Sequence, residues 1–212
     1  VEGAGADDLS KSSFRRGFGA FFASLVDLVR QSGGQFKWHG VIPCGGRLEA
    51  YKDFCTALKQ SPDDWNILLV DAEEALPEKC ANPVCRNWEH LAKRQGDGWG
   101  RPDGVDDSWC FLMITTMETW LIADRVAITT FYGNGFNPNA LPKNADLQSV
   151  SKDAVMSGLE RAIKDTTKGK KDGYKKIAHG CALLQAVNVA TVRAALPECD
   201  RLFRELEARI AA

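Results

Sequence analysis

The sequence contains no apolar run long enough to cross a lipid bilayer, and no signal peptide is visible at its start. We therefore expect no membrane association. The seven cysteines are an odd number scattered along the chain, which fits a reducing cytoplasm better than a disulfide framework. The chain opens with Val1-Glu2-Gly3, which resembles the end of a strand, so we also expect that residues precede Val1.

The chain also lacks an excess of charge of either sign, and its formal net charge is −1. A neutral balance gives no global signature of nucleic-acid binding, although it is compatible with a local basic groove. Neither a Walker motif nor a dinucleotide-binding motif is present, and no Ser-His-Asp or Cys-His arrangement indicates a nucleophile. These absences argue against a nucleotide-binding enzyme and against a serine or cysteine hydrolase.

One group of residues has spacing compatible with zinc, namely Cys80, Cys85 and His90. Four residues separate the two cysteines, but a fourth ligand is not obvious. A loop with free thiols is the simpler interpretation, and His90 is alternatively a general base or a structural histidine.

Strand and helix patterns alternate along the first seventy residues. The predicted elements, in chain order, are a strand at 1–3, a helix at 13–31, a strand at 38–44, a helix at 48–58 and a strand at 66–70. This alternation is typical of an α/β fold with a parallel sheet and right-handed crossovers.

The remainder of the chain is irregular at first and then mostly helical. Residues 75–109 are rich in Gly and Pro and predict an insertion over the carboxyl edge of the sheet. A fourth strand is expected at 110–116, with a helix directly after it. Further predicted elements are helices at 117–124, 151–165 and 174–184, a basic turn at 168–171, and a last helix that starts at Pro197.

Acidic residues follow two of the predicted strands. Glu2 ends the first strand, and Asp71 and Glu73 follow the apolar run 66–70. The carboxyl ends of parallel strands meet at one edge, and carboxylates gathered there repel each other unless a cation lies between them. Mg²⁺ or Mn²⁺ suits such oxygen ligands. The alternative is that these are solvated acids at the starts of loops or helices.

Other charged side chains are expected near the same crevice. Glu118 begins the helix after the fourth strand and is a further candidate metal ligand. Arg47 follows Gly45-Gly46 at a helix start, where it could hold a phosphate or simply lie on the surface. Lys176 and His179 share a helix face that also reads as a solvated basic face.

The two acidic clusters resemble the TOPRIM domain of topoisomerases, primases and OLD nucleases. In that family a Glu ends the first strand and an Asp-x-Asp ends the third, and Glu73 stands here where the family usually has Asp. The resemblance implies a mostly parallel TOPRIM-like sheet of about four strands flanked by helices. It places the α/β domain at 1–132, with the insertion at 75–109, and a helical C-terminal extension at 133–212.

A closer resemblance, to a TOPRIM-related bacterial family of unknown function, covers nearly the whole chain. Its motifs appear here as Glu2, Arg15-Arg16-Gly17-Phe18, Cys44-Gly45-Gly46-Arg47, Asp71-Ala72-Glu73, Trp88-Glu89-His90-Leu91, Met117-Glu118-Thr119-Trp120 with Ala123-Asp124, and Tyr174-Lys175-Lys176 with His179. Relatives of this kind often sit beside an ABC-type or AAA ATPase in anti-phage operons. The resemblance therefore implies a nuclease effector controlled by an ATPase partner.

These observations predict a Mg²⁺- or Mn²⁺-dependent endonuclease acting on DNA or RNA. Glu2, Asp71 and Glu73 would be catalytic metal ligands, with Glu118 as a further ligand and Lys176 as a catalytic cation. The expected phosphate or nucleic-acid contacts are Arg16, Arg47, Lys175 and His179. A non-catalytic partner or sensor subunit that docks on the ATPase is the alternative, phosphoryl transfer on a small nucleotide is a weaker one, and a homodimer is also open.

Overall fold

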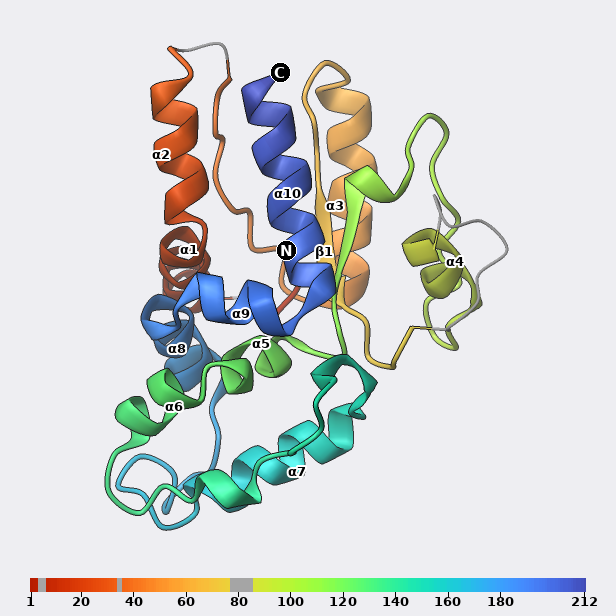
Figure 1. The fold of residues 1–212 in the computed structure, drawn as a ribbon. Helices are drawn as coiled ribbons and strands as arrows, with labels where there is room; N and C mark the ends of the chain where they lie inside the picture. The colour runs from red at the N-terminus through yellow and green to blue at the C-terminus, as the bar shows by residue number, and fades with distance from the viewer. Residues whose placement is uncertain (4–6, 34–35, 77–85) are drawn as a thin grey trace.

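The computed structural model describes residues 1–3, 7–33, 36–76 and 86–212 (Figure 1). At its centre lie two parallel strands, β1 (Leu68–Asp71) and β2 (Cys110–Met113), paired from Leu68 opposite Cys110 to Asp71 opposite Met113. Every residue of both strands is buried. This agrees with the continuous apolar runs of the sequence, which are typical of strands covered on both faces.

The sheet separates two hydrophobic cores, because successive side chains of a strand point to opposite faces. Leu69 and Phe111 belong to the larger core, whereas Val70 and Leu112 belong to the smaller one. Two helices supply the smaller core, α3 (Arg47–Gln60) and α4 (Arg86–Lys93).

The larger core is covered by eight other α-helices of the described chain. These are α1 (Asp8–Phe21), α2 (Ala23–Gln31), α5 (Met117–Ala123), α6 (Arg125–Tyr132), α7 (Lys152–Ile163), α8 (Cys181–Ala186), α9 (Val189–Ala195) and α10 (Pro197–Ala211). Figure 1 shows α10 beside α2, and α10 packs against α2, β2 and α9. Short 3₁₀ turns occupy Asp107–Trp109, Pro138–Ala140 and Leu147–Ser149. No helix in the described ranges is both long and apolar enough to span a membrane.

The sheet is smaller than the expected four strands, since the described residues form two. Of the other two segments, residues 1–3 lie beside β1, and residues 42–45 lie beside residues 1–3. Glu2 N donates to Leu69 O at 3.2 Å, and Cys44 N donates to Val1 O at 3.0 Å. These segments are joined to β1 and to each other by hydrogen bonds, but they are not strands of the sheet.

Two expected helices are divided. The helix predicted at 13–31 begins earlier, at the Asp7 cap, and breaks at Phe22 into α1 and α2. The helix predicted at 174–184 starts as a π-helical turn, Lys176–Gly180, before α8 continues it. Ser151 caps α7 and Pro197 opens α10 as the sequence predicted.

Candidate metal centre

Backbone pairing brings the acidic residues of two segments to one place. Beyond the end of β1, Ala72 N donates to Met113 O at 2.9 Å and Glu73 N to Thr115 O at 2.7 Å. On the other side, the hydrogen bond from Glu2 N to Leu69 O fixes the start of the chain beside β1. The carboxyl edge of the sheet therefore gathers Glu2, Asp71 and Glu73, as the topology argument predicted.

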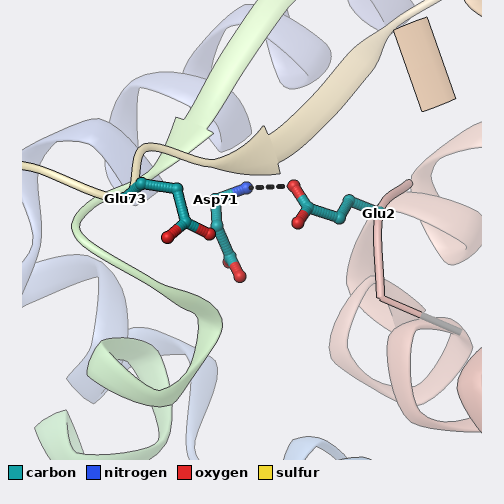
Figure 2. Close-up of side chains that lie close together, drawn as sticks. All are labelled: Glu2, Asp71 and Glu73. Carbon is teal, nitrogen blue, oxygen red and sulfur yellow. Dashed lines mark hydrogen bonds between the residues drawn. The ribbon is translucent and has the colours of Figure 1, made fainter. Parts of the chain in front are cut away.

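Figure 2 shows these three side chains facing one another. Each offers one carboxylate oxygen, and the three oxygens lie within 4.8 Å of one another. The side chain of Asp71 is 1% exposed, that of Glu2 12% and that of Glu73 18%. Burial, followed by the negative charge of Asp71, raises the pKa of Glu2 above its ordinary value. A cation between the carboxylates would relieve this repulsion.

Glu73 adopts an unusual backbone conformation. Its φ is 71°, in the left-handed region that residues with a side chain seldom occupy. This conformation raises the local free energy, and it persists only where the rest of the fold fixes the backbone. Such positions cluster at functional sites. This conformation accompanies a Glu73 side chain that lies next to Asp71 (Figure 2).

Asp71 is held by donors from three groups. Met117 N, at the start of α5, donates to Oδ1 at 2.7 Å. Lys176 Nζ donates to Oδ2 at 3.0 Å, and the Thr116 hydroxyl donates to the same oxygen at 3.3 Å. Burial would lower the pKa of Lys176, but Asp71 and Glu118 outweigh it and raise that pKa. Lys176 is therefore a permanent positive charge at this edge.

Arg47 orients Glu2 and donates hydrogen bonds to three residues. Its Nη1 donates to Glu2 Oε2 at 3.0 Å and to the carbonyl of Asp71, while its Nε and Nη2 donate to the two carboxylate oxygens of Asp97 at 2.8 and 2.6 Å. Its guanidinium also lies 4.9 Å from the centre of the Trp99 ring. Arg47 thus supports the acidic cluster, and the phosphate contact expected from its position after Gly45-Gly46 stays a prediction.

Glu118 lies in a second layer behind Asp71. Its Oε2 accepts from the Thr116 hydroxyl at 2.5 Å, and its Oε1 accepts from the Tyr174 hydroxyl at 3.0 Å. Burial and the neighbouring Glu118 raise the pKa of Tyr174, so Tyr174 stays a donor at neutral pH. Glu118 is outside the group of three converging carboxylates, and its connection to Asp71 runs through Thr116.

The other predicted residues lie outside the acidic cluster. Arg16 is exposed on α1, and Lys175 pairs with Asp172 at 2.6 Å. His179 is buried, with its Nδ1 3.2 Å from the Tyr132 hydroxyl. The ring Nε2 of His90 lies 2.8 Å from Ala72 O, directly behind the strand end. Cys80 and Cys85 fall outside the described residues.

Sequence reasoning missed Asp97 and Lys152. Lys152 Nζ donates to both oxygens of Glu73, at 2.7 and 2.6 Å, from 79 residues away. Asp97 holds Arg47 from 50 residues away, and its flanking glycines indicate a turn instead of a partner. Neither pairing leaves a local pattern in the sequence.

The donor set fits a hard divalent cation. Three carboxylates at fixed positions match the oxygen ligands of Mg²⁺ or Mn²⁺, and Mg²⁺ usually takes one or two of them together with water. The ammonium groups of Lys152 and Lys176 already lie on Glu73 and Asp71, which shows that the cluster attracts positive charge. An ion would join or displace them.

Comparisons with other proteins give one match. No curated protein and no solved structure matches the chain. A family model described as a domain of unknown function (DUF4276) matches residues 1–207, nearly the whole length. The chain therefore belongs to the DUF4276 family.

Proposed function

We propose that this protein is a Mg²⁺- or Mn²⁺-dependent nuclease that hydrolyses phosphodiester bonds in DNA or RNA. The observation that carries this proposal is the convergence of Glu2, Asp71 and Glu73 within 4.8 Å at the carboxyl edge of a parallel sheet. A divalent cation bound there would activate water and stabilise charge on phosphate oxygens.

The chain's own residues divide the remaining tasks. Glu2, Asp71 and Glu73 would hold the ion, and Arg47 fixes the orientation of Glu2. Lys176, protonated at neutral pH, neutralises charge on the scissile phosphate. Thr116 and the amide of Met117 fix Asp71, while Glu118 positions Thr116 through a hydrogen bond.

The test is to remove one carboxylate charge at a time. We expect Asp71→Asn and Glu2→Gln to abolish Mn²⁺ binding in calorimetry and metal-dependent cleavage of plasmid, single-stranded DNA or transfer RNA. Asp27→Asn, an exposed acid on α2 paired with Arg30, is the matched control and should keep both. Metal-dependent cleavage that survives both site substitutions would overturn the proposal.

The cellular setting is part of the same proposal and rests on the resemblance of the whole chain. We place the nuclease in the cytoplasm as the effector subunit of an anti-phage system, controlled by an ABC- or AAA-type ATPase. Co-purification with the ATPase encoded next to it, and cleavage that depends on ATP, would test this arrangement. Size-exclusion chromatography with light scattering would test the homodimer.

A second candidate function is a non-catalytic subunit that docks on the ATPase. The ion pairs Lys152–Glu73 and Lys176–Asp71 favour it, because they neutralise two of the three carboxylates without a metal. Stable complex formation together with no calorimetric signal for Mg²⁺ or Mn²⁺ would select this function over the nuclease.

A further inference from the structure

The segment between α7 and the π-helical turn concentrates positive charge. Residues 161–176 contain seven Lys or Arg and two Asp, in a chain whose net charge is −1. The near-neutral total therefore hides a local basic region. We call residues 164–175, which carry five of the lysines, the basic turn.

The basic turn has a defined backbone. The Thr166 hydroxyl donates to Ile163 O at 2.7 Å and accepts from Gly169 N at 2.9 Å, and Gly173 N donates to Gly169 O at 2.9 Å. A Cβ at Gly169 would lie 2.3 Å from Ile163 O, so only glycine allows this close packing against the end of α7. The lysines are consequently presented from a fixed scaffold.

The basic turn leads directly into the candidate metal centre. Tyr174 N donates to Glu160 Oε1 at 3.0 Å, which anchors the end of the turn to α7. The Tyr174 hydroxyl then contacts Glu118, and Lys176 contacts Asp71. The lysines of the turn and Lys176, which contacts Asp71, are therefore successive parts of one ordered segment.

Two lysines of the turn are available to a ligand. The other three have partners: Lys164 lies 4.0 Å from Asp165, Lys168 donates to Phe131 O at 2.5 Å and lies over the Phe131 ring, and Lys175 pairs with Asp172. Lys170 and Lys171 are exposed, and no ion pair within the described part of the chain involves either of them. Exposed, uncompensated cations on a fixed backbone suit a polyanion, which releases its own counterions on binding.

We propose that the basic turn binds the sugar-phosphate backbone of a nucleic acid, through Lys170 and Lys171, on the same strand whose scissile phosphate reaches the metal centre. This inference rests on the proposed nuclease function and extends it to a substrate-binding surface. The contacts are to phosphates, so the turn contributes affinity and orientation without sequence preference.

The test measures binding separately from cleavage. Fluorescence anisotropy with fluorescein-labelled single-stranded DNA, duplex DNA and RNA is carried out in EDTA, at several salt concentrations. For the variant Lys170→Gln/Lys171→Gln we expect weaker binding and a slope of log affinity against log salt that is smaller by about 1.4 for single strands and about 1.8 for duplex DNA. Neither side chain makes an ion pair with a described residue, so the thermal stability should be unchanged.

The matched control is Lys52→Gln/Lys59→Gln, two exposed lysines on α3 with the same total change of charge. It should keep the salt slope of the unmodified protein. Equal slopes for the basic-turn variant and the unmodified protein would overturn the inference, and so would an equal loss in the control, which would indicate net charge alone. Asp71→Asn tests the nuclease independently, because loss of cleavage with retained binding would leave the basic turn supported.

Discussion

The carboxylate of Asp71 is the residue on which the candidate site depends most. It is almost completely buried, yet the Met117 amide, the Thr116 hydroxyl and the Lys176 ammonium all donate to it. A buried charge is tolerated only with such partners. Lys176 also passes close to Gly3, where a Cβ would lie 3.1 Å from its Cε. The first segment of the chain and the π-helical turn are therefore linked through one lysine.

Removing the Lys176 ammonium should expose this dependence. We expect Lys176→Met to lower the free energy of unfolding by about 2 kcal/mol, because Asp71 loses its buried counter-charge; partial solvent exposure of Lys176 keeps the loss below that of a fully buried pair. Added Mn²⁺ should raise the melting temperature of this variant more than that of the unmodified protein, since the ion can take the place of the ammonium. Differential scanning fluorimetry with and without Mn²⁺ measures both effects.

Lys175→Met is the control for this prediction. Lys175 is half exposed, and within the described part of the chain its ion pair is with Asp172, which is also half exposed. Loss of the Lys175 ammonium should therefore change the free energy of unfolding by less than about 0.5 kcal/mol. A Lys176→Met protein as stable as this control would show that Asp71 does not need the lysine.

Asp107 gives the protein a pH dependence of its own. Its carboxylate accepts from Asn87 N at 2.8 Å and Trp88 N at 3.2 Å at the start of α4, but burial raises its pKa to about 6. The folded protein therefore holds this proton more tightly than the unfolded chain does. The resulting stability is present at low pH and is lost as the pH rises from about 4 through 6.

The variant Asp107→Asn isolates this contribution. The free energy of unfolding of the unmodified protein, relative to the variant, should fall by about 1 kcal/mol between pH 4 and pH 7, a figure reduced for solvent screening. Urea titrations at four pH values provide the measurement. A difference that stays constant across this range would contradict the raised pKa.

At the scale of elements, the contact between α1 and α8 positions the segment that carries Lys176. A Cβ on Gly17 of α1 would lie 2.9 Å from Cys181 O and 3.1 Å from Cys181 Cα, so the two helices touch through backbone. Gly19, two residues later, is exposed and has no neighbour within 4 Å of such a Cβ. The same helix thus offers one glycine required by packing and one that is not.

These two glycines predict opposite effects of the same substitution. Gly17→Ala should lower the free energy of unfolding by about 1–3 kcal/mol, because it forces α1 and α8 apart. Gly19→Ala should raise it by up to about 1 kcal/mol, because alanine favours the helix. Chemical denaturation of both variants gives the comparison. A stabilised Gly17→Ala protein would show that this helix contact is not tight.

The elements that could be predicted from the sequence are those with a local signal. The apolar runs before Asp71 and at 110–116 predicted β1 and β2. The acidic residues at the ends of the predicted strands indicated the group of carboxylates at one edge of the sheet. The break at Phe22 and the start of α8 as a π-helical turn depend on packing between distant segments, which periodicity does not record. The same holds for the site, where Glu2, Asp71 and Glu73 follow from topology but Lys152 and Asp97 do not.

At the scale of the whole molecule, the predicted α/β domain (1–132) and the predicted helical extension (133–212) contribute side chains to one hydrophobic core. Phe21 stacks on Trp120 with ring centres 5.1 Å apart, and Phe203 of α10 lies 5.7 Å from Phe21. A buried polar network adds a second link, since Asn87 on α4 donates to Glu198 on α10 at 2.7 Å. Arg201 of α10 also donates to Cys110 O, at the first residue of β2. The C-terminal helix is therefore part of the support of the sheet.

This shared core predicts that residues 1–132 and 133–212 unfold together. All six tryptophans lie between positions 38 and 120, so their fluorescence reports the first region, whereas circular dichroism at 222 nm also reports the helices of the second. In urea the two signals should give the same midpoint. Deletion of residues 197–212 should abolish the cooperative transition, because it uncovers the apolar side chains of β2 and α2 that α10 buries. Two separate midpoints, or a deletion variant that still unfolds cooperatively with native tryptophan fluorescence, would instead establish 133–212 as an independent extension.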